Sequence, residues 1–299
     1  DDDDNAMQAL LELLELLERW PELVEQLRRR AELSPDAGEQ QRAFERIAEI
    51  YGEQLPEPKQ AIEAWRQVLG LDPSSGRALD ALERLYAGAE DWIELIWVYQ
   101  RKLELTDDGE LWRGLQISVA RTYEEQLGDN FEAINAYRSI LDQGDLEAPQ
   151  RRPILDALDR LYTRESLWSD LLEIVEAKAE IADSDEVNGL RFRAGAILAN
   201  EIGDLDGAID RFERVVEDDA SDEAAREALE GLLDDEGQRV RVALILEHVH
   251  RSRGDVPALI AVMERRLSTV AEPQERRDIL IRIAELSEEG LSNSQAAFE

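Results

Sequence analysis

Two histidines and an adjacent acid are the residues best suited to metal or acid–base chemistry. His248 and His250 are the only histidines among the 299 residues, and Glu247 precedes them. Imidazole and carboxylate groups are common zinc ligands. On a helix, residues i and i+2 face different directions, so this pair cannot chelate one ion as an i, i+4 pair does. His250 also aligns with Tyr86 and Tyr162 in the repeats described below, which indicates a packing role. We therefore predict no metal site.

Other arrangements that could support catalysis are missing from the sequence. The chain has no cysteine, which excludes thiol chemistry and disulfides. Serines such as Ser118 and Ser139 have no histidine near them in the repeat pattern. With 69 acidic residues, carboxylate pairs are expected by chance. Neither Gly-x-x-x-x-Gly-Lys nor Gly-x-Gly-x-x-Gly, the strings that cradle phosphate, is present. We predict no catalytic residues, no cofactor and no enzymatic activity.

The charge balance limits the possible partners. The formal net charge is −35, with an isoelectric point near 4.3. Nucleic acids are held mainly by Lys and Arg on phosphates, so the acidic chain argues against them and against anionic membranes. The charge either keeps a long exposed surface soluble or attracts a basic partner. No run of 18 apolar residues occurs, so we predict no membrane insertion.

The ends of the chain bear on its compartment. Absence of cysteine is compatible with a reducing cytoplasm. Residues 1–6 carry neither the basic nor the apolar region of a signal peptide, and are expected to be a disordered acidic tail or a cloning remnant. A cytoplasmic location is favoured. The chain stops inside a helical pattern, at Phe298-Glu299. We expect it to be a piece of a longer protein, whose export signal, if it had one, would lie upstream.

Two alternating templates repeat along the chain. The first begins at Trp20, Trp92, Trp168 and Val256, each followed by a Leu three residues later, at spacings of 72, 76 and 88 residues. The second is a small residue, then an aromatic or Leu three residues on, and then Ala-Ile-x-x-aromatic. Its copies are Ala48, Tyr51, Leu55, Ala61, Ile62 and Trp65; Ala120, Tyr123, Leu127, Ala133, Ile134 and Tyr137; and Gly195, Leu198, Ile202, Ala208, Ile209 and Phe212; a fourth begins at Ala284.

Each segment of these templates has the spacing of an amphipathic helix, and turn residues separate one segment from the next. Ile117, Ala120, Tyr123 and Leu127, for example, share one face at i, i+3 and i+4 spacing. Residues that end one helix or cap the start of the next, such as Gly128-Asp129, separate the helical segments. The order predicts paired antiparallel helices, with alanines such as Ala61, Ala133 and Ala208 where neighbouring helices approach closely. One hairpin could not bury these faces alone, so stacking is required.

The combined pattern resembles the tetratricopeptide repeat (TPR), in particular long bacterial TPR arrays that alternate Trp-x-x-Leu and Leu-Gly-Asp-x-x-x-Ala-Ile hairpins. The resemblance implies an all-α fold: an α-solenoid of stacked antiparallel hairpins in a right-handed superhelix, with about seventeen helices. It covers 7–299 as a single solenoid, with an extra helix near 223–235, helix 238–252 paired with 256–270, and a truncated last hairpin. The closing proline of the family appears only at Pro73, and the Trp hairpins keep Leu where a small residue is usual.

The resemblance also implies where a ligand would bind. In TPR proteins the first helix of each hairpin lines a concave groove. Its outward basic positions here, our candidates for a peptide-binding groove, are Arg77, Arg84, Arg121, Arg160, Arg164, Arg241, His248 and Arg251. Acidic residues share it: Glu45, Glu49, Asp80, Glu124, Glu125 and Asp156. The groove is either a solvated face with local ion pairs or a surface that captures acidic peptides, since Arg matches carboxylates bidentately. The Asn and Lys of the two-carboxylate clamp of chaperone-binding TPRs are absent.

The leading hypothesis is a non-catalytic scaffold that binds a protein or peptide segment in this groove. The alternative is a structural arm of a larger assembly that self-associates through its ends. The run Leu10-Leu11-x-Leu13-Leu14-x-Leu16-Leu17 favours it, because terminal repeats usually carry a polar capping face. A third possibility, an enzyme's regulatory domain, depends on sequence outside this chain.

Overall fold

The described part of the chain is built entirely from helices. The computed structural model describes residues 2–144 and 146–291, and within them it contains sixteen α-helices and no strand. The expected all-α fold is therefore confirmed. A further helix after α16, needed for the expected count of about seventeen, would fall on residues 292–299, outside the described residues. The chain divides into two compact units, Asp1–Gly144 and Asp145–Glu299.

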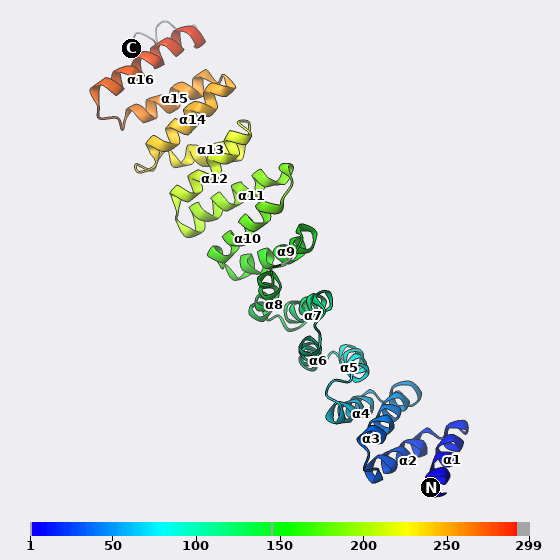
Figure 1. The fold of residues 1–299 in the computed structure, drawn as a ribbon. Coiled ribbons are helices and arrows are strands. Elements are labelled where there is room, and N and C mark those ends of the chain that lie inside the picture. The colour runs from blue at the N-terminus through cyan, green and yellow to red at the C-terminus, as the bar shows by residue number, and fades with distance from the viewer. Residues whose placement is uncertain (1, 145, 292–299) are drawn as a thin grey trace. The chain divides into compact units, whose positions relative to one another are not determined.

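The first unit holds eight α-helices that pack against their neighbours in sequence (Figure 1). They are α1 (Asp2–Leu16), α2 (Trp20–Leu33), α3 (Ala37–Glu49), α4 (Pro58–Leu71), α5 (Gly76–Gly88), α6 (Trp92–Leu105), α7 (Gly109–Arg121) and α8 (Asn130–Asp142). Helix α1 begins at Asp2, so residues 2–6, expected to be a disordered tail, are helical. Its continuation contains most of the apolar run that begins at Leu10.

The second unit continues the same order of helices. They are α9 (Ala148–Glu165), α10 (Trp168–Ile181), α11 (Ser184–Ile197), α12 (Leu205–Asp218), α13 (Glu223–Leu232), α14 (Arg239–Arg253), α15 (Val256–Leu267) and α16 (Pro273–Leu291). Helix α13 occupies most of the segment 223–235, where an extra helix was expected. Helix α14 packs against α15, and it also touches α12, which lies two helices earlier.

Local sequence explains where these helices start. The four copies of the first template begin α2, α6, α10 and α15, which we call the second helices of the Trp hairpins. Acidic caps precede many helices: the side chain of Asp36 accepts a hydrogen bond from the backbone N–H of Gly38, and Asp222 and Asp255 cap α13 and α15 in the same way. Such caps satisfy backbone donors that have no partner inside the helix.

The small residues of the second template allow close packing. Ala61, Ala133 and Ala208 are completely buried, as the sequence predicted. At Gly195 the approach is closer still, because an added Cβ would lie 2.6 Å from the ring of Phe212. In this hairpin the ring of Phe212 therefore sits over Gly195, and the close packing needs a residue without a side chain at that position.

The structure contains a feature that the sequence pattern did not reveal. Helices α3, α7 and α11 each end in a π-helical turn, named η1 (Ile50–Gln54), η2 (Thr122–Leu127) and η3 (Leu198–Ile202). In η3, for example, the N–H of Gly203 donates to the carbonyl of Leu198 at 2.8 Å, five residues earlier. Gly128 and Gly203 close η2 and η3 in the left-handed region, with φ of 66° and 83°, which glycine adopts at little cost.

Candidate functional site

A cavity in the first unit brings together two of the predicted groove residues. It has a volume of about 300 Å³ and lies against α3, η1, α4 and α5. We call it the α3–α5 cavity. Its lining residues are Ala48, Glu49, Gly52, Glu53, Ala61, Trp65, Arg77, Ala81, Arg84 and Leu85. The alanines and Trp65 are buried and form its floor. A Cβ added to Gly52 would meet no atom of another packed segment within 4 Å, so the cavity is open there.

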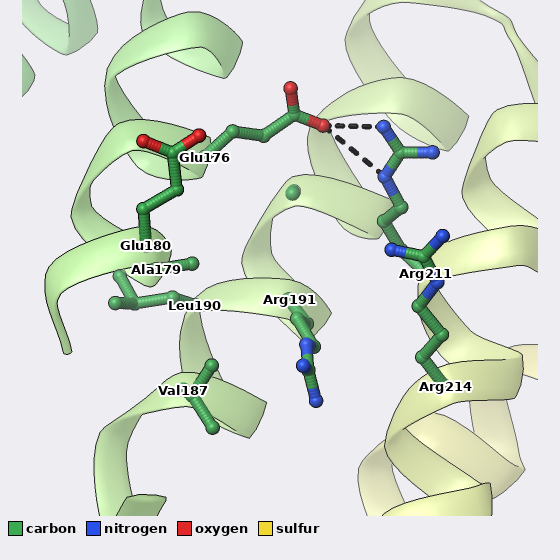
Figure 2. Close-up of a pocket in the computed structure, with 9 residues that line it drawn as sticks. Glu176, Ala179, Glu180, Val187, Leu190, Arg191, Arg211 and Arg214 are labelled. Carbon is green, nitrogen blue, oxygen red and sulfur yellow. Dashed lines mark hydrogen bonds and ion pairs between the residues drawn. The ribbon is translucent and has the colours of Figure 1, made fainter. Parts of the chain in front are cut away.

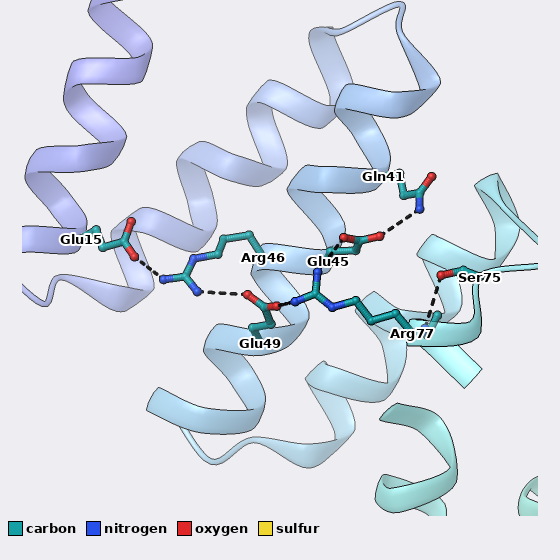
Figure 3. A network of polar contacts seen from close by, with 8 residues as sticks. Glu15, Gln41, Glu45, Arg46, Glu49, Ser75 and Arg77 are labelled. Atoms are coloured by element: carbon teal, nitrogen blue, oxygen red, sulfur yellow. Dashed lines mark hydrogen bonds and ion pairs between the residues drawn. The ribbon is translucent and has the colours of Figure 1, made fainter. Parts of the chain in front are cut away.

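Arg77 is already engaged by acids of the preceding hairpin. Its guanidinium lies 3.1 Å from Glu45, pairs with Glu49, and sits 6.0 Å from the centre of the Trp65 ring. Glu49 in turn pairs with Arg46, so the contacts form a chain of alternating charges (Figure 3). The Arg77 side chain is 61% exposed, whereas those of Glu45 and Glu49 are 16% and 21% exposed. Pairs in which the basic partner stays in contact with water contribute about 1 kcal/mol or less. For Arg77, the structure agrees with the interpretation of a solvated face with local ion pairs.

Arg84 differs from Arg77 because no acid engages it. Its Nε donates to the backbone carbonyl of Asp80 at 3.3 Å, and no carboxylate among the described residues pairs with its guanidinium. The carboxylate of Asp80 forms an ion pair with Lys102, whose Nζ lies 2.5 Å away. Arg84 is exposed and lines the cavity. It is therefore the predicted groove arginine best placed to receive a carboxylate from outside.

In the second unit, Arg241 and His248 line a different cavity. This α12–α14 cavity has a volume of about 430 Å³, and its other lining residues are Glu213, Val216, Glu217, Leu244, Ile245 and Val249. Arg241 pairs with Asp210 and lies 3.5 Å from both Asp206 and Glu213. The hydrogen bond to Asp210 raises the pKa of Arg241, although burial opposes it. Among these lining residues, His248 is the exposed basic group, and it forms no ion pair with a described residue.

The other four predicted groove residues do not line these two cavities. Arg121, Arg160, Arg164 and Arg251 are exposed on α7, α9 and α14. Subtracting the repeat spacings shows that Arg84, Arg160 and His248 occupy the same position in three hairpins, 76 and 88 residues apart. The structure thus brings together Arg77 with Arg84, and Arg241 with His248, each pair within its own unit.

The two histidines of the chain point into different cavities. His248 is exposed in the α12–α14 cavity, whereas His250 is buried and lines a separate cavity beside α15. Within the described residues, no group of three or more His, Asp or Glu side chains could hold a metal ion. No helix in that same part of the chain combines the length and apolar character that crossing a bilayer requires.

A third cavity, which the sequence reasoning missed, lies among α10, α11 and α12. It measures about 360 Å³, and its apolar lining includes Val187 and Leu190 (Figure 2) as well as Ala194. Arg211 donates two hydrogen bonds to Glu176 at its rim, at 3.2 and 2.5 Å. Arg214 also lines it, is exposed, and has no acidic partner among the described residues. A third arginine of the lining, Arg191, pairs with Asp218. The cavity therefore has two paired arginines and one unpaired arginine, whereas the α3–α5 cavity has one of each.

A recurring ion pair was also missed by sequence reasoning. It joins the first and second helices of three Trp hairpins, always 19 residues apart: Glu83–Lys102 at 2.5 Å, Asp159–Lys178 at 2.8 Å and Glu247–Arg266 at 3.0 Å. Two of the three lysines of the chain occupy this position, and this regularity was the available signal. Because the partners face each other between packed helices, the pairs hold each hairpin together.

The second of these pairs is the most buried and has an additional partner. Arg193 of α11 donates to both oxygens of Asp159, at 2.6 and 2.5 Å. Burial alone would raise the pKa of Asp159, but hydrogen bonds from Arg193 and Lys178 lower it below its usual value. For Glu247, burial outweighs the attraction of Arg266 and raises the pKa. These buried acids are structural, since none lines the cavities described above.

The helices and cavities together define an all-α protein of stacked, TPR-like helix hairpins. No protein-family model matches the chain, and no curated protein sequence matches it. Solved structures do match.

The chain is similar to YrrB, described as a TPR protein with an unusual peptide-binding site, at 14% identity and a TM-score of 0.33, over 62% of this chain and 90% of that one. It is similar to the C-terminal part of a TPR repeat-containing protein from Cytophaga hutchinsonii, at 11% identity and a TM-score of 0.32, over 79% and 99%. In the structure of Naa15/Naa10 bound to HypK-THB, the match has 15% identity and a TM-score of 0.44; it covers 98% of this chain but 56% of the other.

Proposed function

We propose that the protein is a non-catalytic scaffold that binds a segment of a partner protein in the α3–α5 cavity. The observation that carries this proposal is the unpaired guanidinium of Arg84 beside a floor of buried alanines and Trp65. A side chain lying on that floor would bury apolar area, and a neighbouring carboxylate would reach Arg84. Arg binds carboxylates through two parallel hydrogen bonds, so the position of the acid in the segment would be selected.

The charges around the cavity restrict what that segment can be. Glu49 is neutralised by Arg46 and Arg77, but Glu53 lines the cavity with no ion pair among the described residues. A segment with several adjacent acids would be repelled by Glu53 and by the net charge of −35. The lining therefore favours a segment with one acid for Arg84, a basic residue close to it, and an apolar residue between them.

The proposal is tested by reversing the charge of one arginine. Arg84→Glu should abolish capture of partners from the native cell extract in an affinity pull-down read by mass spectrometry. Hydrogen bonds to charged groups contribute about 1.5–3 kcal/mol, so capture should fall at least about tenfold. The matched control is Arg28→Glu, an exposed arginine on α2 outside the cavity, which changes the net charge by the same amount.

The two variants together decide the outcome. Partners lost from Arg84→Glu but kept by Arg28→Glu support binding in the cavity. Partners kept by both variants, or lost equally from both, contradict it. Adding Arg160→Glu, the equivalent position in the second unit, extends the same comparison to α9. Circular dichroism of each variant shows whether it remains helical.

A second function, self-association through the ends of the array, is favoured by exposed leucines on α1. Leu11 and Leu14 are buried, but Leu13 and Leu17 are half exposed and Leu16 is 80% exposed. On α16, Leu280 and Ile281 are also half exposed. Terminal helices of a solenoid usually present polar residues, and clustered apolar side chains often mark interaction sites.

Light scattering separates this second function from the first. A molecular mass that rises with concentration, and returns to 34.0 kDa in Leu16→Lys, would support association through α1. The control Leu111→Lys places the same charge on a leucine of α7 that is 54% exposed. A mass of one chain at every concentration would remove this function from consideration.

A further inference from the structure

The cavity among α10, α11 and α12 has more basic than acidic side chains in its lining. We call it the α10–α12 cavity. It is lined by Arg191, Arg211 and Arg214, against the two acids Glu176 and Glu180. In the α3–α5 cavity two arginines meet two glutamates, and in the α12–α14 cavity one arginine meets two. In a chain with a net charge of −35, an excess of arginine at one cavity creates a local site of attraction for an anion.

The three arginines are particular to this hairpin. Aligning the second template on Gly195 and Ala208 places uncharged residues at all three positions in the other two copies. The equivalents of Arg191, Arg211 and Arg214 are Phe44, Ala64 and Gln67 in the first copy, and Gln116, Ala136 and Ser139 in the second. Hairpins of the same template form without arginine at these positions, so folding alone does not explain the cluster.

The helices place the basic groups beside apolar ones. Arg211 and Arg214 lie three residues apart on α12, so their side chains share one face of that helix. Figure 2 shows these two side chains extending from α12, and that of Arg191 extending from α11, on which Val187 and Leu190 also lie. Leu190 is buried. A ligand in this cavity would therefore meet both guanidinium groups and an apolar surface.

The present partners of these arginines are weak competitors for a ligand. Arg211 pairs with Glu176, and Arg191 pairs with Asp218; the side chains of these acids are 42% and 53% exposed. Ion pairs with such exposed partners contribute little to stability, because the acid can turn to water when its arginine is taken. Arg214 is exposed and forms no ion pair with a described residue. All three guanidinium groups are thus available at small cost.

The arrangement favours a dianion over a carboxylate. A carboxylate has one charge and two oxygens, so it would offer Arg191 and Arg211 no more than Asp218 and Glu176 already do. A phosphate monoester carries a charge of about −1.5 to −2 at pH 7 and has three strong acceptor oxygens. It can therefore accept hydrogen bonds from three guanidinium groups at once. The planar fork of arginine also matches the geometry of phosphate.

The two glutamates indicate what carries the phosphate. The Glu180 side chain is 71% exposed, and its ion pair with Arg151 is long, at 4.0 Å. Glu176 would lose Arg211 to the ligand. Both acids would repel a free phosphate ion, but they would attract a basic residue beside the phosphate. A protein segment can supply such a neighbour, and its carbon atoms can contact the apolar lining.

We propose that the α10–α12 cavity binds a phosphorylated side chain of a partner protein, in a segment that carries a basic residue next to it. The phosphate is held by Arg191, Arg211 and Arg214, and the basic residue by Glu176 and Glu180. The site lies in the second unit and shares no residue with the α3–α5 cavity, so it goes beyond the function proposed above. Binding here depends on whether the partner is phosphorylated.

The test measures binding of short peptides to the full chain by isothermal titration calorimetry. The probe is a blocked lysyl-phosphoserine dipeptide, compared with the same dipeptide containing serine or glutamate. The phosphoserine form should bind saturably and at least about tenfold more tightly than the glutamate form, because it gains at least one more charge-assisted hydrogen bond. Inorganic phosphate should bind at least about tenfold more weakly than the phosphoserine dipeptide, because it lacks the basic group for Glu176 and Glu180.

Variants built from residues that the chain uses elsewhere locate the site. Arg214→Ser introduces the residue of the second copy at an exposed position, and should weaken binding about tenfold or more. The matched control Arg277→Ser removes an exposed arginine of α16 outside the cavity and should leave binding unchanged. Combining Arg191→Gln and Arg211→Ala with Arg214→Ser reproduces the second copy and should abolish binding. If circular dichroism shows that this triple variant does not fold, Arg214→Ser still tests the site.

Four results would overturn the proposal. The phosphoserine dipeptide could bind no more tightly than the serine form, or Arg214→Ser could bind it as wild type does. Equal losses in Arg214→Ser and Arg277→Ser would show that binding follows overall charge and not this cavity. Inorganic phosphate that binds as tightly as the dipeptide would assign the cavity to a free ion. Weakening that appears in Arg214→Ser and not in Arg277→Ser, together with preference for the phosphoserine dipeptide, would support the proposal.

Discussion

Removing the carboxylate of Asp159 should destabilise the second unit through the basic groups it leaves behind. Asp159 accepts hydrogen bonds from Lys178 at 2.8 Å and from Arg193 at 2.6 and 2.5 Å. Breaking a buried ion pair by removing one partner costs about 3–5 kcal/mol. Here Lys178 keeps Asp156 at 2.7 Å, and the Arg193 side chain is 38% exposed and can regain water. We therefore expect Asp159→Ala to lower the free energy of unfolding by about 2–3 kcal/mol.

Tryptophan distribution makes this effect measurable. Five of the six tryptophans lie in the first unit, and Trp168 at the start of α10 is the only one in the second. In protein labelled with 5-fluorotryptophan, the fluorine resonance of Trp168 follows unfolding of its own unit in urea. Small domains lose about 1–3 kcal/mol per molar urea, so the midpoint should fall by about 1 M or more.

Two further variants decide whether the ion pair is the cause. Glu83→Ala removes the equivalent acid in the first unit, where the glutamate side chain is 34% exposed and Lys102 retains Asp80. It should cost at most about 1 kcal/mol. Asp159→Ala combined with Lys178→Met removes both charges and should recover part of the loss. The reasoning is refuted if Asp159→Ala shifts its midpoint no more than Glu83→Ala, or if the double variant is no more stable than Asp159→Ala.

Two other predictions follow from the packing and the charges. Gly195→Ala should destabilise the second unit by about 1–3 kcal/mol, because the new Cβ would lie 2.6 Å from Phe212. Gly189→Ala, in open space on the same helix, should instead stabilise the unit by up to about 1 kcal/mol. Equal urea midpoints for the two variants would contradict this prediction. Because the pKa of Asp159 is lowered from 3.8 in the folded protein, its contribution to stability is complete above that pH and is lost as the pH falls through the folded value. Wild type should therefore lose stability below about pH 4 more steeply than Asp159→Ala, as followed by the fluorine resonance of Trp168. Parallel curves for the two proteins would contradict a stabilising role of the Asp159 carboxylate.

Much of the helical framework could be predicted because its causes are local. The Trp-x-x-Leu template places the starts of α2, α6, α10 and α15 at the residues where the structure has them. Apolar spacing and capping acids act within one or two helical turns, so the sequence displays them directly. The buried alanines were also identifiable, since a small residue in the middle of an apolar face implies a close neighbour.

The arrangement of the charges could be predicted only in part. The repeat register placed Arg77 and Arg84 on one helix face. It did not show that Arg77 forms ion pairs with Glu45 and Glu49 while Arg84 forms none. That outcome depends on which turns of α3 and α5 face each other. The division of the chain near Gly144 and the π-helical turns likewise depend on contacts beyond the local pattern.

The three π-helical turns also carry information about how the array arose. A π turn holds one residue more than an α turn at the same place in a helix, so it corresponds to a single inserted amino acid. Such a turn closes α3, α7 and α11 alike, in hairpins that otherwise share one template. Three separate insertions at matching points would be needed if the copies had diverged first. The simplest history is that the ancestral hairpin already contained the extra residue and that duplication copied it into each descendant.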